Sequence, residues 1–126
     1  MGYNIMSATC PSRVLLHRIG ARWTVFIVNA LANGPMRFGE LRERVQGITP
    51  KVLTETLRSM ELDGLVGRSV FDENPPRVEY SLTDLGLSLL VPLQAVRQWA
   101  ETYVPAVLAA RQQNRSLEIT ERQRNI

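Results

Sequence analysis

Residues 37–82 carry the pattern that most constrains what this chain can fold into. A short amphipathic helix, a tight turn, a second helix and a two-stranded hairpin follow one another there without a gap. These segments are 37–41, 47–50, 51–63, 66–71 and 78–82, with the helix-breaking Gly64 and a turn-rich stretch at 72–76 between them. A helix placed by a tight turn can enter the major groove of DNA, while a hairpin behind it can reach the flanking backbone or minor groove.

The second helix of this pattern has a well-specified start and two distinct faces. Thr49 can cap the first unpaired N–H groups, and Pro50 suits the first helical position. Leu53, Leu57 and Met60 recur at i, i+4 and i+7 and should face the core. The opposite face carries side chains that can contact phosphates or base edges: Lys51, Thr54, Glu55, Arg58 and Ser59.

The alternative for this face is an ordinary solvated surface with a Lys51–Glu55 pair at i, i+4. For an isolated helix that alternative would be favoured, but the preceding helix and the following hairpin favour DNA contact. The residues that we predict to form the DNA-binding surface are Arg37, Thr49, Pro50, Lys51, Thr54, Glu55, Arg58 and Arg77.

The hairpin alternates apolar and polar residues. Val78, Tyr80 and Leu82 should pack inward and leave the residues between them facing outward. Arg77 is the side chain nearest the tip that could touch DNA. Its alternative is an ion pair across the hairpin with Glu73 or Glu79.

Several strings along the chain resemble those of the HxlR-type regulators, which are small MarR-like winged-helix transcription factors of bacteria. The resemblance covers about residues 10–103, and its most specific string follows the helix-turn-helix. The matching strings are CP at 10–11, GARWT at 20–24, RFGEL at 37–41, GIT at 47–49, KVLT at 51–54, DGLV at 63–66 and PPRVEYSLT at 75–83.

The resemblance implies a homodimer that binds a pseudo-palindromic operator in double-stranded DNA. Two positions depart from the family pattern. The family often has a basic residue where Thr56 stands, which bears on the operator sequence, and often Lys where Arg22 stands, which changes little.

Positive charge is distributed unevenly along the chain. The formal net charge is +3, yet residues 37–77 contain seven basic and seven acidic residues. The surplus lies in Arg13, Arg18 and Arg22 and in four arginines from Arg111 onward, where it can attract phosphates or simply maintain solubility.

The length and composition predict one globular domain, and nothing in them indicates an enzyme. His17 is the only histidine and Cys10 the only cysteine, so one chain has no material for a catalytic triad or a thiolate zinc site. There is no P-loop or dinucleotide fingerprint, and we expect no cofactor or metal. The absence of a signal sequence or a long apolar run predicts a cytoplasmic protein without a membrane partner, associated with the nucleoid through its operator.

The flanking segments predict self-association. Pro11 can open a first helix, and a second helix over about 21–32 has core spacing at Trp23, Ile27, Ala30 and Leu31. Thr83 should cap a long helix, which Pro92 bends or breaks and Pro105 bends or ends. Its apolar face exceeds what a small winged domain can cover, so we expect a dimer interface, with intrachain packing as the alternative for Trp99 and Tyr103. The predicted interface residues are Leu85, Leu89, Leu93, Val96, Trp99 and Tyr103.

Cys10 stands just before the Pro-initiated helix, where a thiol can have a lowered pKa and a more reactive thiolate. Some HxlR-type regulators sense quinones, aldehydes or oxidants through a cysteine at the position that Cys10 matches. The alternative is a buried cysteine that packs as a small apolar side chain.

These observations predict a mainly α-helical winged helix-turn-helix protein with a small β-hairpin wing, which dimerises through its N- and C-terminal helices. The predicted parts are an N-terminal arm (1–9), the winged domain with its dimerisation helices (10–111) and a flexible tail (112–126). We expect a sequence-specific transcriptional regulator, a repressor or an activator, that responds to an oxidant or an electrophile through Cys10 or to another small-molecule inducer. The rival hypothesis is a winged-helix scaffold for protein interactions without sequence-specific DNA contact.

Overall fold

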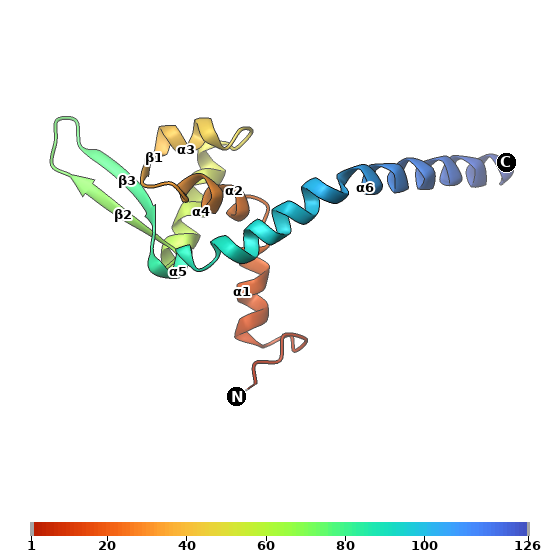
Figure 1. Ribbon diagram of the computed structural model, residues 1–126, viewed down its shortest axis with the longest axis horizontal. Coiled ribbons are helices and arrows are strands. Elements are labelled where there is room, and N and C mark those ends of the chain that lie inside the picture. Colours follow the sequence, from red (N-terminus) through yellow and green to blue (C-terminus); the bar gives the residue numbers. More distant parts are fainter. Residues whose placement is uncertain (1, 126) are drawn as a thin grey trace. The chain divides into compact units, whose positions relative to one another are not determined.

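The computed structural model describes residues 2–125, and the chain divides into two units, Met1–Leu90 and Val91–Ile126. Figure 1 shows the order of the elements along the chain. They are α1 (Pro11–Ile19), α2 (Thr24–Leu31), β1 (Met36–Arg37), α3 (Phe38–Arg44), α4 (Pro50–Leu62), β2 (Val66–Phe71), β3 (Arg77–Leu82), α5 (Asp84–Leu87) and α6 (Leu90–Arg124). The mainly helical fold with a small antiparallel sheet is the winged helix-turn-helix that the sequence predicts.

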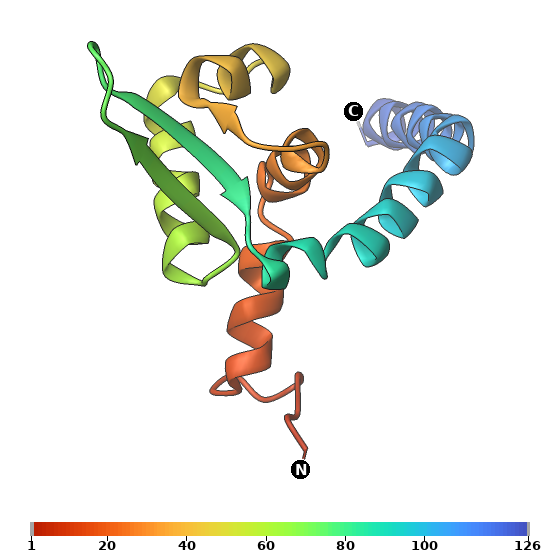
Figure 2. The ribbon, with the colours of Figure 1, turned by 60° about the vertical axis from the view of Figure 1, so that its left-hand side comes forward.

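The core of the first unit lies where α2, α3 and α4 meet the sheet. Ile27, Leu31, Leu41, Leu53 and Leu57 are all at most 2% exposed. The predicted core positions of α4 are therefore confirmed, and so are those of α2 except Trp23, which is half-buried at the start of that helix. In Figure 2 the hairpin of β2 and β3 runs alongside α4 and projects beyond the helices.

The sheet has the order β1-β3-β2, with both pairs antiparallel. The two-residue strand β1 was not expected from the sequence; it pairs Met36 with Tyr80 and closes the inner edge of β3. The predicted alternation along β3 is wrong, because all six of its residues are half-buried. The hairpin projects past the helices that would cover its apolar face, and its polar side chains partly cover one another.

The long helix expected after Thr83 is divided in the structure. The Thr83 hydroxyl accepts a hydrogen bond from the Gly86 N–H at 3.1 Å and caps α5, which ends at Leu87, and α6 starts at Leu90. The break thus precedes Pro92, which lies in the first turn of α6, where no intrahelical N–H is required. Pro105 lies inside α6 and does not end it.

Residues 112–124, which belong to the predicted flexible tail, continue α6 in the structure. A helix that is already nucleated adds residues at little cost, and Gln, Arg, Leu and Glu are good helix formers. All described residues of this segment are exposed, and its mobility in solution stays a prediction.

Among residues 2–125, no single helix is both long and apolar enough to span a bilayer. Only α1 and α2 taken as a pair meet the criteria of length and composition, and they are bent by 70° where they join.

Gly86 is required by a close approach of two backbone segments. A Cβ atom at this position would lie 2.1 Å from the carbonyl oxygen of Leu65, which immediately precedes β2. Gly39, in the first turn of α3, has no atom within 4 Å of such a Cβ. The junction between α5 and the sheet therefore excludes any side chain at Gly86.

We expect Gly86→Ala to lower the free energy of unfolding by about 1–3 kcal/mol, because backbone atoms must shift to admit the methyl group. The matched change Gly39→Ala should leave stability unchanged or raise it by up to about 1 kcal/mol. Urea unfolding followed by circular dichroism measures both. Equal stability of the two variants would contradict this packing.

Candidate nucleic-acid interface

The position of α4 is set by its two ends and its buried stripe. At the start, the Thr49 hydroxyl accepts a hydrogen bond from the Val52 N–H at 3.2 Å, and Pro50 occupies the first turn. The turn before it is anchored by Val45 and Ile48, both 5% exposed. Gly47 has a φ of 89°, which side chains rarely adopt. These contacts make α4 the second helix of a helix-turn-helix. We refer to α4 as the recognition helix.

Three of the predicted contact residues form an exposed stripe on the recognition helix. Lys51, Glu55 and Arg58 are exposed and lie opposite the buried Leu53 and Leu57. Within the described part of the chain Lys51 and Glu55 form no ion pair, so the alternative of a neutralised i, i+4 pair is not realised. The stripe therefore presents two separate cations and one carboxylate to solvent.

The other predicted residues of α4 are more constrained. The Thr54 hydroxyl donates to the Pro50 carbonyl oxygen at 2.8 Å, which turns it back along the helix. Ser59 is half-buried, toward the flank of the helix that faces Thr24 and Arg18 across a hollow. Thr49 is occupied as the cap described above. Thr49, Thr54 and Ser59 can therefore contact DNA only through the parts of their side chains that remain exposed.

Arg37 lies at the entry to α3 and is exposed. Its N–H donates to the Glu40 carboxylate at 3.0 Å, which stabilises the first turn of that helix. Two further basic side chains, Arg42 and Arg44, are exposed in the last turn of α3. We did not predict these two residues from the sequence, although a basic pair at the end of the first motif helix is visible there.

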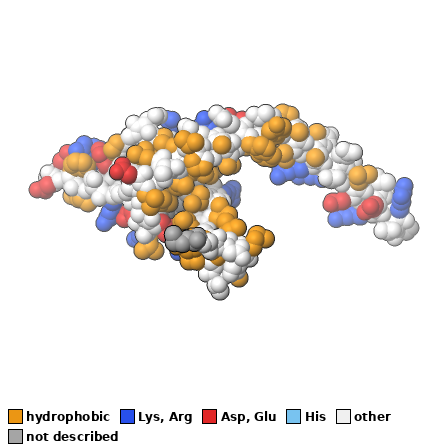
Figure 3. Space-filling view, turned by 60° about the horizontal axis from the view of Figure 1, so that its bottom comes forward, with side chains coloured by type: hydrophobic (Ala, Val, Ile, Leu, Met, Phe, Trp, Pro, Cys, Tyr) orange, Lys and Arg blue, Asp and Glu red, His pale blue; other side chains and the backbone are white. Residues whose placement is uncertain are grey.

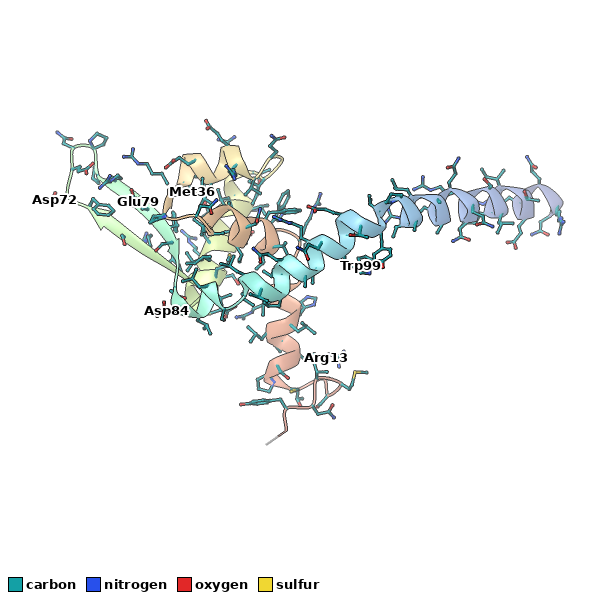
Figure 4. The ribbon with its side chains drawn as sticks, viewed as in Figure 1. Arg13, Met36, Asp72, Glu79, Asp84 and Trp99 are labelled. Carbon is teal, nitrogen blue, oxygen red and sulfur yellow. The ribbon has the colours of Figure 1, made fainter. Side chains whose placement is uncertain are left out.

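Arg77 is held within the wing, which we define as residues 66–82. Its guanidinium nitrogens lie 3.2 Å from a Glu73 carboxylate oxygen and 3.6 Å from one of Glu79. Its guanidinium carbon lies 4.1 Å from the centre of the Phe71 ring. The structure thus shows the alternative to DNA contact at this residue. Figure 4 labels Asp72 and Glu79 on the same hairpin.

The wing as a whole carries three acidic and two basic residues. Arg68 on β2 is exposed, at a position paired with Tyr80. With Arg77 engaged, Arg68 is the more accessible cation of the wing.

Cys10 caps α1 through its position and not through its side chain. Its sulfur lies 2.9 Å from the Ser12 hydroxyl oxygen, and this hydrogen bond is the main cause of a lowered pKa for the Cys10 thiol. Burial opposes that effect, and the nearby backbone of Ser12 and Arg13 adds to it. The predicted direction is confirmed, yet the side chain is only 7% exposed, as the alternative of a packed cysteine requires.

The predicted interface residues differ in exposure. Leu89 and Leu93 are half-buried, whereas the others are at least half exposed: Leu85, Val96, Trp99 and Tyr103. The rings of Trp99 and Tyr103 lie 5.5 Å apart on the same helix. Figure 3 shows apolar side chains gathered along the first half of α6, with basic side chains more frequent further along. Within the first unit, α1 also exposes Val14, Leu15 and Leu16.

Comparisons with known proteins agree with this architecture. Residues 18–107 match the family model described as HxlR-like helix-turn-helix. The chain is 40% identical over 108 residues to the uncharacterized HTH-type transcriptional regulator YtfH of Escherichia coli (strain K12). This alignment covers 86% of each chain.

Two solved structures of relatives have the same fold as this chain. The transcriptional regulator YtfH of Salmonella typhimurium superimposes with a TM-score of 0.80 and 39% identity, over 88% of this chain and 99% of that one. The redox regulator HypR in its reduced form gives a TM-score of 0.73 and 34% identity, over 79% and 98%. The chain belongs to the HxlR-like helix-turn-helix family of transcriptional regulators.

Proposed function

We propose that the protein is a homodimeric regulator that binds a pseudo-palindromic operator, with α4 in the major groove. The observation that carries this proposal is the pair of opposite stripes on the recognition helix: the buried Leu53 and Leu57 turn Lys51, Glu55 and Arg58 outward. Arginine can pair with two acceptors on guanine, and lysine can contact phosphate.

Each of these side chains has a distinct task in the proposal. Arg58 contacts a base edge from the middle of the helix, and Lys51 contacts phosphate near its start. Glu55, between them, accepts from a cytosine amino group or repels the wrong base. Arg37, which immediately precedes α3, and Arg42 and Arg44 on α3 contact the DNA backbone that this helix crosses. The wing approaches through Arg68, because Arg77 is paired with two carboxylates.

The dimer in the proposal is formed by the exposed apolar faces of α1 and α6. Side chains as large as Trp99, Tyr103 and Leu16 are each at least 50% exposed in the single chain. Large exposed apolar side chains on a helix face mark protein association sites. A two-fold dimer joins two recognition helices, which is why the operator is expected to have two related half-sites.

Regulation through Cys10 is supported by two observations. The hydrogen bond from Ser12 lowers the pKa of the thiol, so more thiolate is present near neutral pH. The structural relative HypR is described as a redox regulator. In the proposed step the thiolate sulfur forms a bond to a ring carbon of a quinone, and the C=C π bond at that carbon breaks. The electron pair moves to a carbonyl oxygen, which takes a proton from solvent, and transfer of the ring C–H proton to the other oxygen gives a hydroquinone thioether. The quinone is itself reduced to the hydroquinone level, so no external oxidant is needed.

For DNA binding, Arg58→Ala should weaken binding to a duplex selected by the wild-type protein by about 1–3 kcal/mol and relax the preference at one base pair. Lys51→Ala should weaken binding to all sequences more evenly and reduce the salt slope by about 1. Arg97→Ala removes one positive charge from α6, which has no residue in the proposed DNA-binding surface, and serves as the control.

Fluorescence anisotropy at several salt concentrations measures these effects. The scaffold hypothesis predicts neither sequence preference nor steep salt dependence for the wild-type protein. Unchanged affinity of Arg58→Ala and Lys51→Ala, with the fold intact, would remove the recognition helix from the interface.

For the dimer, Trp99→Asp should place a charge in the proposed interface and convert dimers into monomers at micromolar concentration. Gln98→Asp places the same charge one residue away, off the apolar face, and should leave the dimer intact. Sedimentation velocity distinguishes the two masses. A dimer that persists in Trp99→Asp would show that this face is not the interface.

For the thiol, Ser12→Ala should raise the pKa of Cys10, because the strongest of the interactions that favour the thiolate is lost. The pH at which the thiolate forms, followed by its absorbance at 240 nm, should therefore move upward. At a fixed neutral pH the reaction with a quinone should slow. A titration curve identical to that of the wild-type protein would contradict the role of Ser12.

A further inference from the structure

An ion pair joins α1 to the end of the recognition helix. The Arg18 guanidinium donates a hydrogen bond to the Asp63 carboxylate, across 45 positions of sequence. Asp63 is the residue that ends α4, and its side chain is 13% exposed, against 44% for Arg18. A charge as covered as that of Asp63 has little access to water, so it depends on its partner more than a surface carboxylate does.

Both partners are tied to the frame of the domain by their backbones. The Arg18 carbonyl oxygen accepts a hydrogen bond from the Thr24 hydroxyl at 3.1 Å, and Thr24 is a 4% exposed residue of the core helix α2. The Asp63 N–H donates to the Ser59 carbonyl oxygen at 3.0 Å. The ion pair therefore connects the core helix to the last turn of the recognition helix.

Packing does not fill the space beside this connection. An open hollow of about 210 Å³ lies between the two sides, lined by Arg18, Ala21 and Thr24 on one and by Thr56, Ser59 and Asp63 on the other. Met60 and Leu65 also line this hollow, so the ion pair bridges α1 and the last turn of α4 at the edge of the core.

We propose that Arg18 and Asp63 are positioning residues for DNA recognition: their ion pair fixes the C-terminal end of the recognition helix at the angle at which Arg58 meets its base. This inference rests on the proposed function and deepens it. Arg58 lies little more than one turn before Asp63, and hydrogen bonds to bases tolerate only a few tenths of an ångström. A small tilt of the last turn of α4 would therefore displace Arg58 from the base that it contacts.

The direction in which one substitution changes DNA affinity distinguishes a positioning role from simple electrostatics. Asp63→Asn removes a negative charge beside the DNA-binding face, so electrostatics alone predicts tighter binding to a polyanion. The proposal predicts the opposite, a loss of about 2- to 30-fold in affinity for a duplex selected by the wild-type protein from a random library. Glu43→Gln, an exposed residue of α3, removes the same charge without an ion pair and should not weaken binding.

A charge swap and a second single variant complete the test. Arg18→Asp combined with Asp63→Arg keeps the total length of the pair and should restore affinity to within about twofold of wild type. Arg18→Gln should lose more affinity than Arg13→Gln, which removes the same charge from the same helix. This comparison does not depend on Asp63→Asn folding, because Arg18 is the exposed partner.

Hydrogen exchange gives a readout without DNA. The amides of Glu61 and Leu62, in the last turn of α4, should exchange faster in Asp63→Asn and return to wild-type rates in the swapped protein. Absence of sequence preference in the wild type would count against the proposed function, whereas a failure of the ion pair would appear only in the variants. Affinity of folded Asp63→Asn equal to or above wild type, or unchanged exchange, overturns the inference.

Discussion

The buried stripe of the recognition helix is the constraint on which the rest of this structure depends. Leu53 and Leu57 are at most 1% exposed and Met60 is 3% exposed, so the helix cannot rotate without exposing them to water. Burying three side chains of this size contributes about 5–9 kcal/mol before the entropy of ordering the chain is counted. That contribution fixes which face of α4 points outward, and therefore which charges the protein presents.

The buried stripe fixes the rotation of α4 about its own axis, and contacts at the two ends of α4 fix the direction of that axis. Thr49 caps the start, and the buried Val45 and Ile48 hold the turn before it. At the other end the Thr83 hydroxyl donates to the Gly64 carbonyl oxygen, which ties the end of β3 to the loop after α4. The close approach of Gly86 to Leu65 brings α5 against the same loop. The helix is thus held by the sheet on one side and by the Arg18–Asp63 pair on another.

The parts of the fold that the sequence predicts are those with short-range causes. The start of α4 follows from Thr49 and Pro50, its buried face from the spacing of Leu53 and Leu57, and the hairpin from two β-type runs around a turn. The tertiary features had no such signal. Nothing local indicates that Arg18 meets Asp63, or that β1 pairs with β3. The division between α5 and α6 occurs before the proline that was expected to cause it.

The same distinction applies to the candidate site. Lys51, Glu55 and Arg58 could be predicted as exposed because helical period alone decides their face. Arg77 could not be assigned by period, since three groups from one hairpin compete for its guanidinium and the nearest are carboxylates. For Cys10, position at a helix start correctly suggests a lowered pKa, but the main cause is the Ser12 hydroxyl, which only the side-chain geometry reveals.

In the proposed complex two copies of α4 occupy successive major grooves on one face of the DNA. Methylation interference tests it most directly, because the N7 atom of guanine lies in the major groove. We expect two clusters of guanines whose methylation blocks binding, centred about 10 base pairs or a multiple of that distance apart. Interference confined to the minor groove, or a single cluster without a partner, would contradict it.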